Sequence, residues 1–277
     1  MLTVRIVLQA RMGSARRPGK TVADIAGRTL LARCVERLAA ARSLGARMMP
    51  QVRWELFVAT SRLSADEPIA RAAAALGCNC VRGSEGDVFA RFLTGTSDLN
   101  NADVVIRATA DNPLYCPERT VRLVEHHLTS GAVYTGIAEA LSPSVPEVFR
   151  VGALRAASLR SDLDAYCREH VTPCFRREGS PFRRELLPPT WAGLDPERRL
   201  TVDTPEDLAN MNALYNALIS LTGADEPTSW TLPQIYGTAL GLEAARFAEN
   251  RSTQAPVAST CGDLPFGAPE KSLAPAA

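Results

Sequence analysis

Apolar segments of two different periodicities alternate along the first half of the chain, and this alternation limits the fold more than any other feature. Runs rich in β-branched residues predict buried strands, and apolar residues spaced three or four apart predict helices. The predicted strands are residues 3–9, 54–60, 78–81 and 103–108. The predicted helices are residues 30–41, 66–76, 85–93 and 118–128. Such strand–helix–strand units connect right-handedly, which predicts an α/β fold with a mostly parallel sheet between two helical layers.

The regular alternation ends near residue 130, where shorter elements predict a small α+β insertion. Its predicted elements are strands 131–135, 146–150 and 183–187 and helices 151–160 and 165–177. A last strand, 199–203, precedes helices 205–221 and 231–248, and residues 45–52 are a predicted loop. We therefore predict one domain over residues 1–249. Residues 250–277, rich in Pro, Ala, Ser and Gly, are a predicted disordered tail.

Composition and charge exclude several classes of protein. The 277 residues carry a formal net charge of +1, so any basic binding site must be local. The seven cysteines include no CxxC pair, which argues against zinc or a disulfide framework and predicts reduced, mostly buried thiols. The N-terminus has no signal-peptide pattern and no apolar run reaches the roughly 20 residues of a membrane span, so we expect a cytoplasmic protein.

A basic loop, Gln9–Lys20, directly follows the first predicted strand. Its four cations are Arg11, Arg16, Arg17 and Lys20. Gly13 and Gly19 allow phosphate oxygens to approach the backbone closely. Because ligands of open parallel sheets bind at the carboxyl ends of strands, this loop predicts a polyphosphate site, and a nucleoside triphosphate has a matching charge. A solvated basic loop is the alternative.

The loop belongs to neither of the two common nucleotide-binding motifs. Gly19-Lys20-Thr21 matches the end of a P-loop, but Ser14 stands where that motif needs its first glycine. The dinucleotide pattern GxGxxG does not occur in the sequence either.

Two aspartates, Asp111 and Asp203, come at the ends of predicted strands. Thr204 has the pattern of a helix N-cap, followed by Pro205 and by an acid, Asp207, at the third helical position. If Thr204 caps that helix, Asp203 is left to face the edge of the sheet. Two carboxylates beside a triphosphate predict a Mg²⁺ site.

Six blocks of sequence resemble the spore-coat-polysaccharide type of cytidylyltransferases, relatives of the enzymes that make CMP-sialic acid and CMP-Kdo. The blocks are Gln9–Lys20, Val58–Ser61, Arg82–Val88, Arg107–Leu114, Arg168–Pro173 and Leu200–Leu208. The first and last are the most specific, and the resemblance as a whole covers roughly residues 3–220. The resemblance implies a three-layer, Rossmann-like nucleotidyltransferase sheet.

The resemblance also implies an activity, transfer of CMP from CTP to an acceptor with release of pyrophosphate, supported by Mg²⁺. It implies catalytic roles for Lys20, Arg11 and Asp111, and metal binding by Asp111 and Asp203. The nucleotide-binding residues that it implies are Gln9, Ala10, Arg11, Gly13, Ser14, Lys20, Gly83, Ser84 and Asp87. It further implies a homodimer in which residues 131–187 carry acceptor and dimer contacts, and no nucleic-acid or membrane partner.

Departures from the family pattern concern the acceptor. Ala110-Asp-Asn-Pro-Leu114 replaces Gly-Asp-Cys-Pro-Leu, a mild change, whereas Pro143 and Pro146 stiffen a stretch that is usually more polar and contains glycine. We therefore expect an acceptor other than the usual sugar, for example phosphonoformate in the biosynthesis of a phosphinothricin-type antibiotic. An acidic sugar for surface polysaccharide is the alternative.

Glu147 and His170 are the candidate acceptor-binding residues, although a structural role for His170 is the alternative. The pair His126-His127 is predicted to lie on a helix surface. An acceptor that is already ionised needs no general base and no covalent intermediate, so positioning and electrostatics would carry catalysis.

Two other functions remain open. A nucleotide-sugar glycosyltransferase would need an Asp-x-Asp metal motif at a strand end. Asp162-Leu-Asp164 matches this pattern but lies between predicted helices. The other open function is that of a non-enzymatic module that binds nucleotides as a sensor and does not turn them over.

Overall fold

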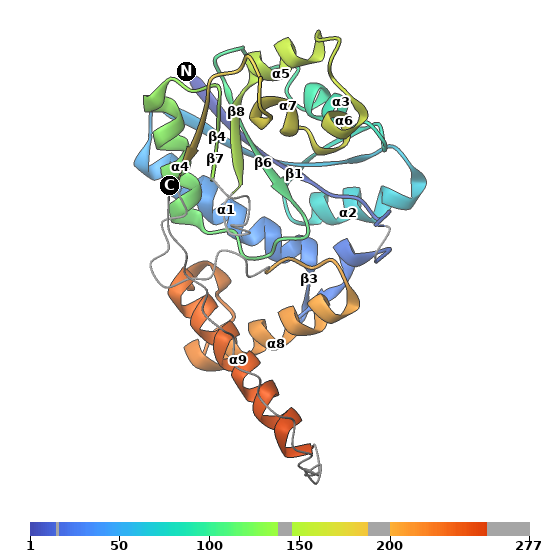
Figure 1. Cartoon of the computed structure of the whole chain (residues 1–277), viewed down its shortest axis with the longest axis vertical. Helices are drawn as coiled ribbons and strands as arrows, with labels where there is room; N and C mark the ends of the chain where they lie inside the picture. The colour runs from blue at the N-terminus through green and yellow to red at the C-terminus, as the bar shows by residue number, and fades with distance from the viewer. Residues whose placement is uncertain (15–16, 138–145, 188–199, 254–277) are drawn as a thin grey trace, which may run out of the picture.

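The computed structural model describes residues 1–14, 17–137, 146–187 and 200–253. Seven strands of this part form one sheet in the order β5-β4-β1-β6-β8-β7-β9 (Figure 1). Their bounds are β1 Leu2–Gln9, β4 Val52–Ser61, β5 Asn79–Gly83, β6 Val104–Thr109, β7 Tyr134–Ile137, β8 Glu147–Arg150 and β9 Arg184–Leu187. Strands β5, β4, β1 and β6 are mutually parallel, β8 is antiparallel to its two neighbours, and β9 is parallel to β7. The predicted mostly parallel sheet is confirmed, and the insertion adds three strands to it.

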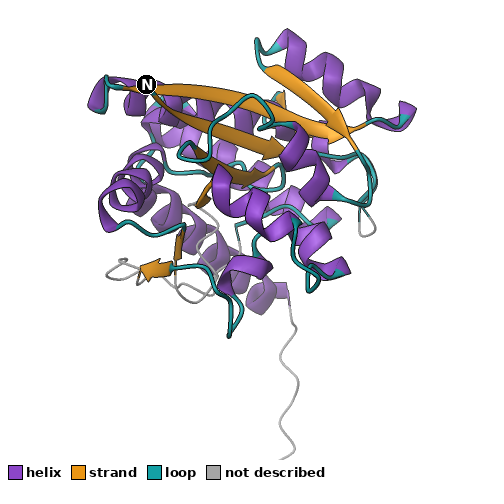
Figure 2. Ribbon diagram, turned by 90° about the horizontal axis from the view of Figure 1, so that it is seen from above, coloured by secondary structure: helices purple, strands orange, loops and turns teal. Residues whose placement is uncertain are grey.

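Helices cover both faces of the sheet, which makes the three predicted layers (Figures 1 and 2). One layer contains α1 Leu30–Met48, α2 Glu67–Ala75 and α4 Pro117–Ser130. The C-terminal helices α8 Pro205–Thr222 and α9 Leu232–Thr253 pack outside α1. The opposite layer contains α3 Val88–Thr94, α5 Val151–Ser158, α6 Ala165–His170 and α7 Pro173–Arg176. Short elements complete the described part: β2 Asp24–Ile25, β3 Arg28–Thr29, η1 Lys20–Val22, η2 Ser64–Asp66 and η3 Pro227–Ser229.

Strand β1 shows why the chain forms two cores. Successive side chains of a strand point to opposite faces, so Ile6 and Leu8 join the core under α1 while Val7 joins the core under α3. Arg5, on the Val7 face, is 2% exposed and forms ion pairs with Glu55 and Asp98 at 2.6 and 2.7 Å. A strand buried on both faces reads as a continuous apolar run, which is the pattern of residues 3–9.

Helix α1 is longer than predicted and continues to Met48, so the first half of the predicted loop 45–52 is helical. The cause is a close contact between Gly45 and Trp54, where a Cβ would lie 2.4 Å from the indole ring. Gly45 lowers the intrinsic helix propensity but allows the helix to pack directly on β4.

The predicted strand 199–203 is wrong for the residues that are described. Leu200–Asp203 has no strand pairing, and one backbone hydrogen bond, from Val202 N to Asp111 O at 2.8 Å, ties it to the end of β6. The pattern of apolar and β-branched residues reflects burial of Leu200 and Val202 rather than membership of a sheet.

Two predicted helices also differ in extent. Residues 165–177 form two helices because Val171 has φ +67°, and Thr172 N donates to His170 O across this tight turn. The predicted helix 85–93 begins later, at Val88, because the Asp87 carboxylate caps it by accepting from Ala90 N.

Four further predictions concern the rest of the chain. Residues 250–253 belong to α9 rather than to the predicted tail, and 254–277 lie outside the described residues. His127 is wrongly predicted to be on the surface: it is fully buried against β7. No helix in the described part is long and apolar enough to cross a membrane. The six cysteines of this part are free thiols and four of them are buried, as predicted.

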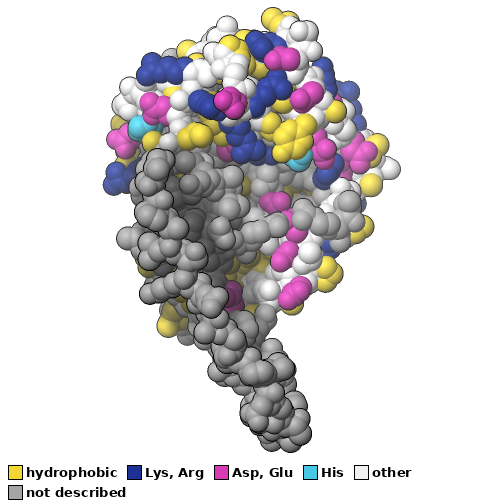
Figure 3. Space-filling model, in the orientation of Figure 1, with side chains coloured by type: hydrophobic (Ala, Val, Ile, Leu, Met, Phe, Trp, Pro, Cys, Tyr) yellow, Lys and Arg dark blue, Asp and Glu magenta, His cyan; other side chains and the backbone are white. Residues whose placement is uncertain are grey.

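Basic and acidic side chains are interspersed on the described surface seen in Figure 3. Together with the net charge of +1, this mixing restricts any strong positive potential to local clusters, as the composition predicts.

Candidate active site

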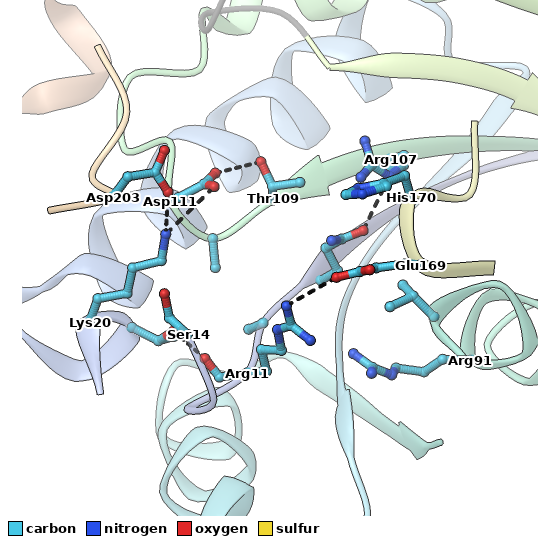
Figure 4. Close-up of a pocket in the computed structure, with 15 residues that line it drawn as sticks. Arg11, Ser14, Lys20, Arg91, Arg107, Thr109, Asp111, Glu169, His170 and Asp203 are labelled. Atoms are coloured by element: carbon cyan, nitrogen blue, oxygen red, sulfur yellow. Dashed lines mark hydrogen bonds and ion pairs between the residues drawn. The ribbon is translucent and has the colours of Figure 1, made fainter. Parts of the chain in front are cut away.

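A pocket of about 310 Å³ opens at the carboxyl ends of β1 and β6 (Figure 4). Gln9, the last residue of β1, pairs in register with Ala59 of β4 and Thr109 of β6, so three strand ends lie at the same edge. Figure 4 shows Lys20, Asp111 and Asp203 at one end of the pocket. Arg107, Glu169 and His170 lie at the other end, and the basic loop carrying Arg11 runs below.

The basic loop is held by a buried carboxylate that the sequence analysis does not include. Asp66 is 2% exposed and accepts hydrogen bonds from Met12 N at 2.7 Å and Ser61 N at 3.2 Å. Gly19 closes the loop by donating its N–H to Met12 O at 2.9 Å, with φ +74°, a conformation that glycine adopts without strain. These bonds fix Met12, the residue after Arg11, through both its N–H and its carbonyl oxygen.

At one end of the pocket, Lys20 lies between the two predicted metal ligands. Its Nζ is 2.9 Å from Asp203 Oδ1, 2.8 Å from Val202 O and 3.8 Å from Asp111 Oδ2. The Thr109 hydroxyl donates to Asp111 Oδ1 at 2.6 Å and orients that carboxylate. The lysine offsets the repulsion that two neighbouring carboxylates would otherwise feel.

The predicted helix cap is confirmed and explains why Asp203 faces the pocket. Thr204 Oγ1 accepts from Asp207 N, and the Asp207 carboxylate accepts from the backbone N–H groups of Asp203 and Thr204. Because Asp207 and Thr204 satisfy the helix terminus, the Asp203 side chain is available to Lys20.

The arrangement of Asp111 and Asp203 fits a magnesium ion. Both carboxylates approach the single Lys20 ammonium, so they converge on one point. One or two carboxylates plus phosphate oxygens and waters are the usual ligands of Mg²⁺ in nucleotide sites. Within the described ranges no group of three or more His, Cys, Asp or Glu could hold a metal, so an ion bound by this pair would need phosphate oxygens and waters as its other ligands.

The other end of the pocket carries an arginine that the site predictions omit. Arg107 Nε donates to Gln9 Oε1 at 3.1 Å and its Nη1 donates to Glu147 Oε2 at 2.7 Å. Its side chain is 13% exposed and lines the pocket. Arg107 is thus held on two sides by neighbouring strands, with its remaining edge toward the pocket.

Glu147, a predicted acceptor-binding residue, does not line the pocket. Its oxygens accept from Tyr134 Oη at 2.6 Å, Thr172 Oγ1 at 2.9 Å and Arg107, and Arg176 lies 3.8 Å away. Burial alone would raise the pKa of Glu147, but Arg107, Arg176 and the two hydroxyl donors outweigh it and lower this pKa. Glu147 is therefore a largely buried anion, 18% exposed, that supports Arg107.

Gly83, Ser84 and Asp87, three predicted nucleotide-binding residues, do not line the pocket but position Arg91, which does. Arg91 is 1% exposed, and its guanidinium donates to Ser84 O at 2.7 and 3.0 Å and to Glu85 O at 3.0 Å. A Cβ on Gly83 would lie 3.1 Å from Arg91 Cγ, so the glycine makes room for this side chain. Arg91 forms no ion pair with any described carboxylate within 4.0 Å, and burial lowers its pKa.

Helix α6 brings Glu169 and His170 to the pocket. Glu169 Oε1 is 3.5 Å from Arg11 Nη2, an ion pair between partly exposed groups. His170 contacts the ring of Tyr166, with centroids 4.5 Å apart. The motif Asp162-Leu-Asp164 lies before α6 outside the pocket, where Asp162 pairs with Arg160 and Asp164 caps the helix.

Comparisons with known proteins identify the family. A profile described as cytidylyltransferase matches residues 5–225. This chain belongs to the cytidylyltransferase family. It is 31% identical over 215 residues to the spore coat polysaccharide biosynthesis protein SpsF of Bacillus subtilis, covering 78% of this chain and 87% of SpsF.

Solved structures share the fold. A cytidylyltransferase from Leptospira borgpetersenii superimposes with a TM-score of 0.70 at 23% identity, covering 92% of this chain and 99% of that one. A CMP-2-keto-3-deoxy-manno-octonic acid synthetase complexed with CTP gives a TM-score of 0.53 at 19% identity, covering 76% of this chain and 98% of that one. These likenesses confirm the predicted nucleotidyltransferase sheet.

For this cytidylyltransferase, the pocket brings together most of the residues predicted from sequence. Those that line it are Gln9, Ala10, Arg11, Ser14, Lys20, Asp111, His170 and Asp203. Gly13 lies outside its lining and Arg16 outside the described residues. Sequence reasoning did not include Arg91 or Arg107 as site residues. The available signals were that each arginine occurs within an otherwise apolar element and that Arg107 begins one of the blocks that resemble the family. The homodimer and the cytoplasmic location stay predictions.

Proposed function

We propose that this cytidylyltransferase transfers CMP from CTP to a small anionic acceptor and releases pyrophosphate. The observation that carries the proposal is the way charged groups are distributed along the pocket. A carboxylate pair with Lys20 lies at one end, and Arg107 and His170 lie at the other. A charged donor and a charged acceptor could therefore bind side by side, each with its own counter-charges.

The reaction joins an acceptor oxygen to the α-phosphorus while the bond from that phosphorus to the bridging oxygen of the β-phosphate breaks. Arg11 and Lys20 would offset the negative charge that grows on the departing pyrophosphate. Gly19 and Asp66 keep the loop in place, so this stabilisation needs little reorganisation during the reaction. A carboxylate or phosphonate acceptor is already ionised and requires no general base.

Asp111 and Asp203 would hold Mg²⁺, which supplies charge neutralisation at the phosphates when bound. Thr109 orients the Asp111 carboxylate directly, and Asp207 fixes the backbone of Asp203 by accepting from its N–H. Outer partners of this kind fix the direction of metal ligands.

The preferred acceptor is a small phosphonate such as phosphonoformate, in the biosynthesis of a phosphinothricin-type antibiotic. Support comes from Pro143 and Pro146, which depart from the sugar-activating pattern; Pro143 lies outside the described residues, and Pro146 is the buried residue directly before β8. An acidic sugar is the second candidate, favoured by the likeness to SpsF and to the octonic acid synthetase. The position of Asp162 and Asp164 outside the pocket gives the glycosyltransferase alternative no support.

The test is pyrophosphate release by the purified protein with Mg²⁺, run over four nucleotides and a panel of phosphonates and acidic sugars. We expect release that depends on both CTP and a phosphonate. Turnover with acidic sugars and none with phosphonates would exclude the phosphonate acceptor. CTP binding without turnover over the whole panel would instead favour a nucleotide sensor.

A further inference from the structure

Arg107 differs from the other cations of the pocket in the way it is fixed. Its Nε donates a hydrogen bond to Gln9 Oε1 and its Nη1 donates one to Glu147 Oε2, whereas no described residue accepts from its Nη2. The two acceptors come from strands on either side, because β1 and β8 both pair with β6. The guanidinium therefore cannot rotate freely and presents the same edge to the pocket.

The support behind Arg107 is itself rigid. Glu147 is bound by the hydroxyls of Tyr134 and Thr172, both of which are almost completely buried. Thr172 follows Val171, whose φ of +67° sets the turn that places His170 in the pocket. Glu147 thus links the arginine on β6 to the segment that carries His170.

The charge balance indicates what Arg107 can bind. Glu147 is shared between Arg107 and Arg176, so one positive charge of this cluster is left unbalanced, and of the five N–H donors of the Arg107 guanidinium only two are used by described residues. A planar monoanion such as a carboxylate matches the donors that remain. Arg107 also lies two residues before Thr109, which orients Asp111, so its ligand would be near the reacting phosphorus.

The two acceptor classes under consideration share one chemical feature. Phosphonoformate carries a carboxylate on its phosphonate phosphorus, and a 3-deoxy-2-ketosugar acid carries one beside its anomeric hydroxyl. We infer that Arg107 binds this carboxylate of the acceptor and so selects acceptors that carry one next to the attacking oxygen. The inference rests on the proposed function. Glu147 then acts as a positioning residue, since it touches Arg107 rather than the acceptor.

The test compares an acceptor acid with its carboxamide, which has nearly the same shape but no charge at that position. For the phosphonate class the pair is phosphonoformate and carbamoylphosphonate; for the sugar class it is the sugar acid and its C1 amide. We expect wild-type protein to prefer the acid in kcat/KM, and Arg107→Gln to reduce this preference by about 10- to 100-fold. CTP binding, measured by calorimetry without acceptor, should change by less than about twofold if Arg107 serves the acceptor alone.

Loss of Arg107 leaves the largely buried Glu147 carboxylate without its nearest counter-charge, so the single variant could fold poorly. The double variant Arg107→Gln/Glu147→Gln removes both charges and keeps hydrogen-bonding groups, and it should show the same loss of preference. Arg107→Lys should still prefer the acid to the amide, but by a smaller ratio of kcat/KM values. The reason is that an ammonium group binds a carboxylate without the two parallel donors of a guanidinium.

The outcomes separate this inference from the proposed function. If wild-type protein turns over an acid but treats its amide equally well, or if the variants keep the wild-type ratio, the role of Arg107 is wrong and the proposed function stands. If wild-type protein turns over no acceptor with CTP, the proposed function fails and the assignment of Arg107 fails with it.

Discussion

Lys20 occupies a position for which arginine is a poor substitute. Its ammonium lies within 2.9 Å of both a carboxylate oxygen and a backbone carbonyl, and only 12% of its side chain is exposed. A compact ammonium can enter this space, whereas a planar guanidinium spreads its donors over a wider fork. Arginine supplies almost all other positive charge of the chain, and the one further lysine, Lys271, lies outside the described residues.

Lys20→Ala should abolish most turnover. We expect kcat to fall about 100-fold or more, the usual cost of removing a group that stabilises charge in the transition state. Lys20→Arg, the matched control, should restore the charge but little of the activity. Pyrophosphate release measures the effect, and circular dichroism checks that both variants are folded. Turnover of Lys20→Ala at the wild-type rate would refute the central role of this loop.

Substitution of two nearby glycines, Gly83 and Gly86, tests the importance of the position of Arg91. A Cβ at Gly83 would lie 3.1 Å from Arg91 Cγ and 3.3 Å from its Cα, whereas a Cβ at Gly86 has no atom within 4 Å. Gly83→Ala should displace Arg91 and lower kcat/KM by about tenfold, with thermal stability reduced by about 1–2 kcal/mol. Gly86→Ala should behave as wild type. Equal kinetics for the two variants would show that the position of Arg91 is unimportant.

At the scale of elements, α3 and α6 form one wall of the pocket. Asp87, which caps α3, also forms an ion pair with Arg168 of α6 at 2.8 Å. The end of α6 then turns at Val171 and leaves His170 facing the pocket. A positive φ at a buried β-branched residue costs energy and persists only where packing enforces it; Val171 belongs to the hydrophobic core to which α3, α5 and β8 also contribute.

Helix α8 contributes to the site through its N-terminus. Thr204→Ala removes the side-chain acceptor for Asp207 N and should cost about 1 kcal/mol of unfolding free energy. Because Asp207 also binds Asp203 N, the variant should weaken the placement of Asp203 and lower the apparent affinity for Mg²⁺ in turnover. Thr204→Ser keeps the hydroxyl and should match wild type. Urea unfolding and a Mg²⁺ titration give the two measurements, and an unchanged Thr204→Ala in both would contradict the role of the cap.

At the scale of the molecule, the sheet lies between two hydrophobic cores. Helix α4 packs against the part of the sheet formed by β7 and β8. His127 of α4 is fully buried there, with Nδ1 bonded to Thr135 Oγ1 at 2.8 Å and Nε2 without a partner among the described residues. Burial, with smaller effects from Arg150 and His126, lowers the pKa of His127 to about 3. The folded protein therefore holds this histidine neutral where the unfolded chain would protonate it.

This burial predicts a pH dependence of stability. The folded pKa is below the unfolded value of 6.5, so the stabilisation is complete above pH 6.5 and is lost as the pH falls toward 3. Between pH 7 and 5 His127 should account for about 2 kcal/mol of lost unfolding free energy. His127→Gln should lose correspondingly less, as measured by urea unfolding at both values. His126, which pairs with Glu185, is present in both proteins, so its contribution to the pH dependence cancels in the comparison. Equal losses would place the pH dependence elsewhere.

The sequence alone determined the elements whose signals are local. The apolar run at 3–9 predicts a strand buried on both faces, the Thr204 pattern predicts its capped helix, and the loop Gln9–Lys20 follows from its place after the first strand. These signals depend on neighbours within a few residues, where periodicity and capping chemistry act. Asp203 is correctly placed although the strand predicted for it is not formed.

Only the tertiary structure decided which charged groups meet. Lys20 and Asp203 are 183 positions apart, and Arg107 and Glu147 are 40 apart, so no local pattern reports either pair. Glu147 therefore changes from an expected acceptor ligand into the support of Arg107, and His127 from a surface residue into a buried one. Strand order and helix packing set these encounters, because a charge can be buried only where the fold brings it a partner.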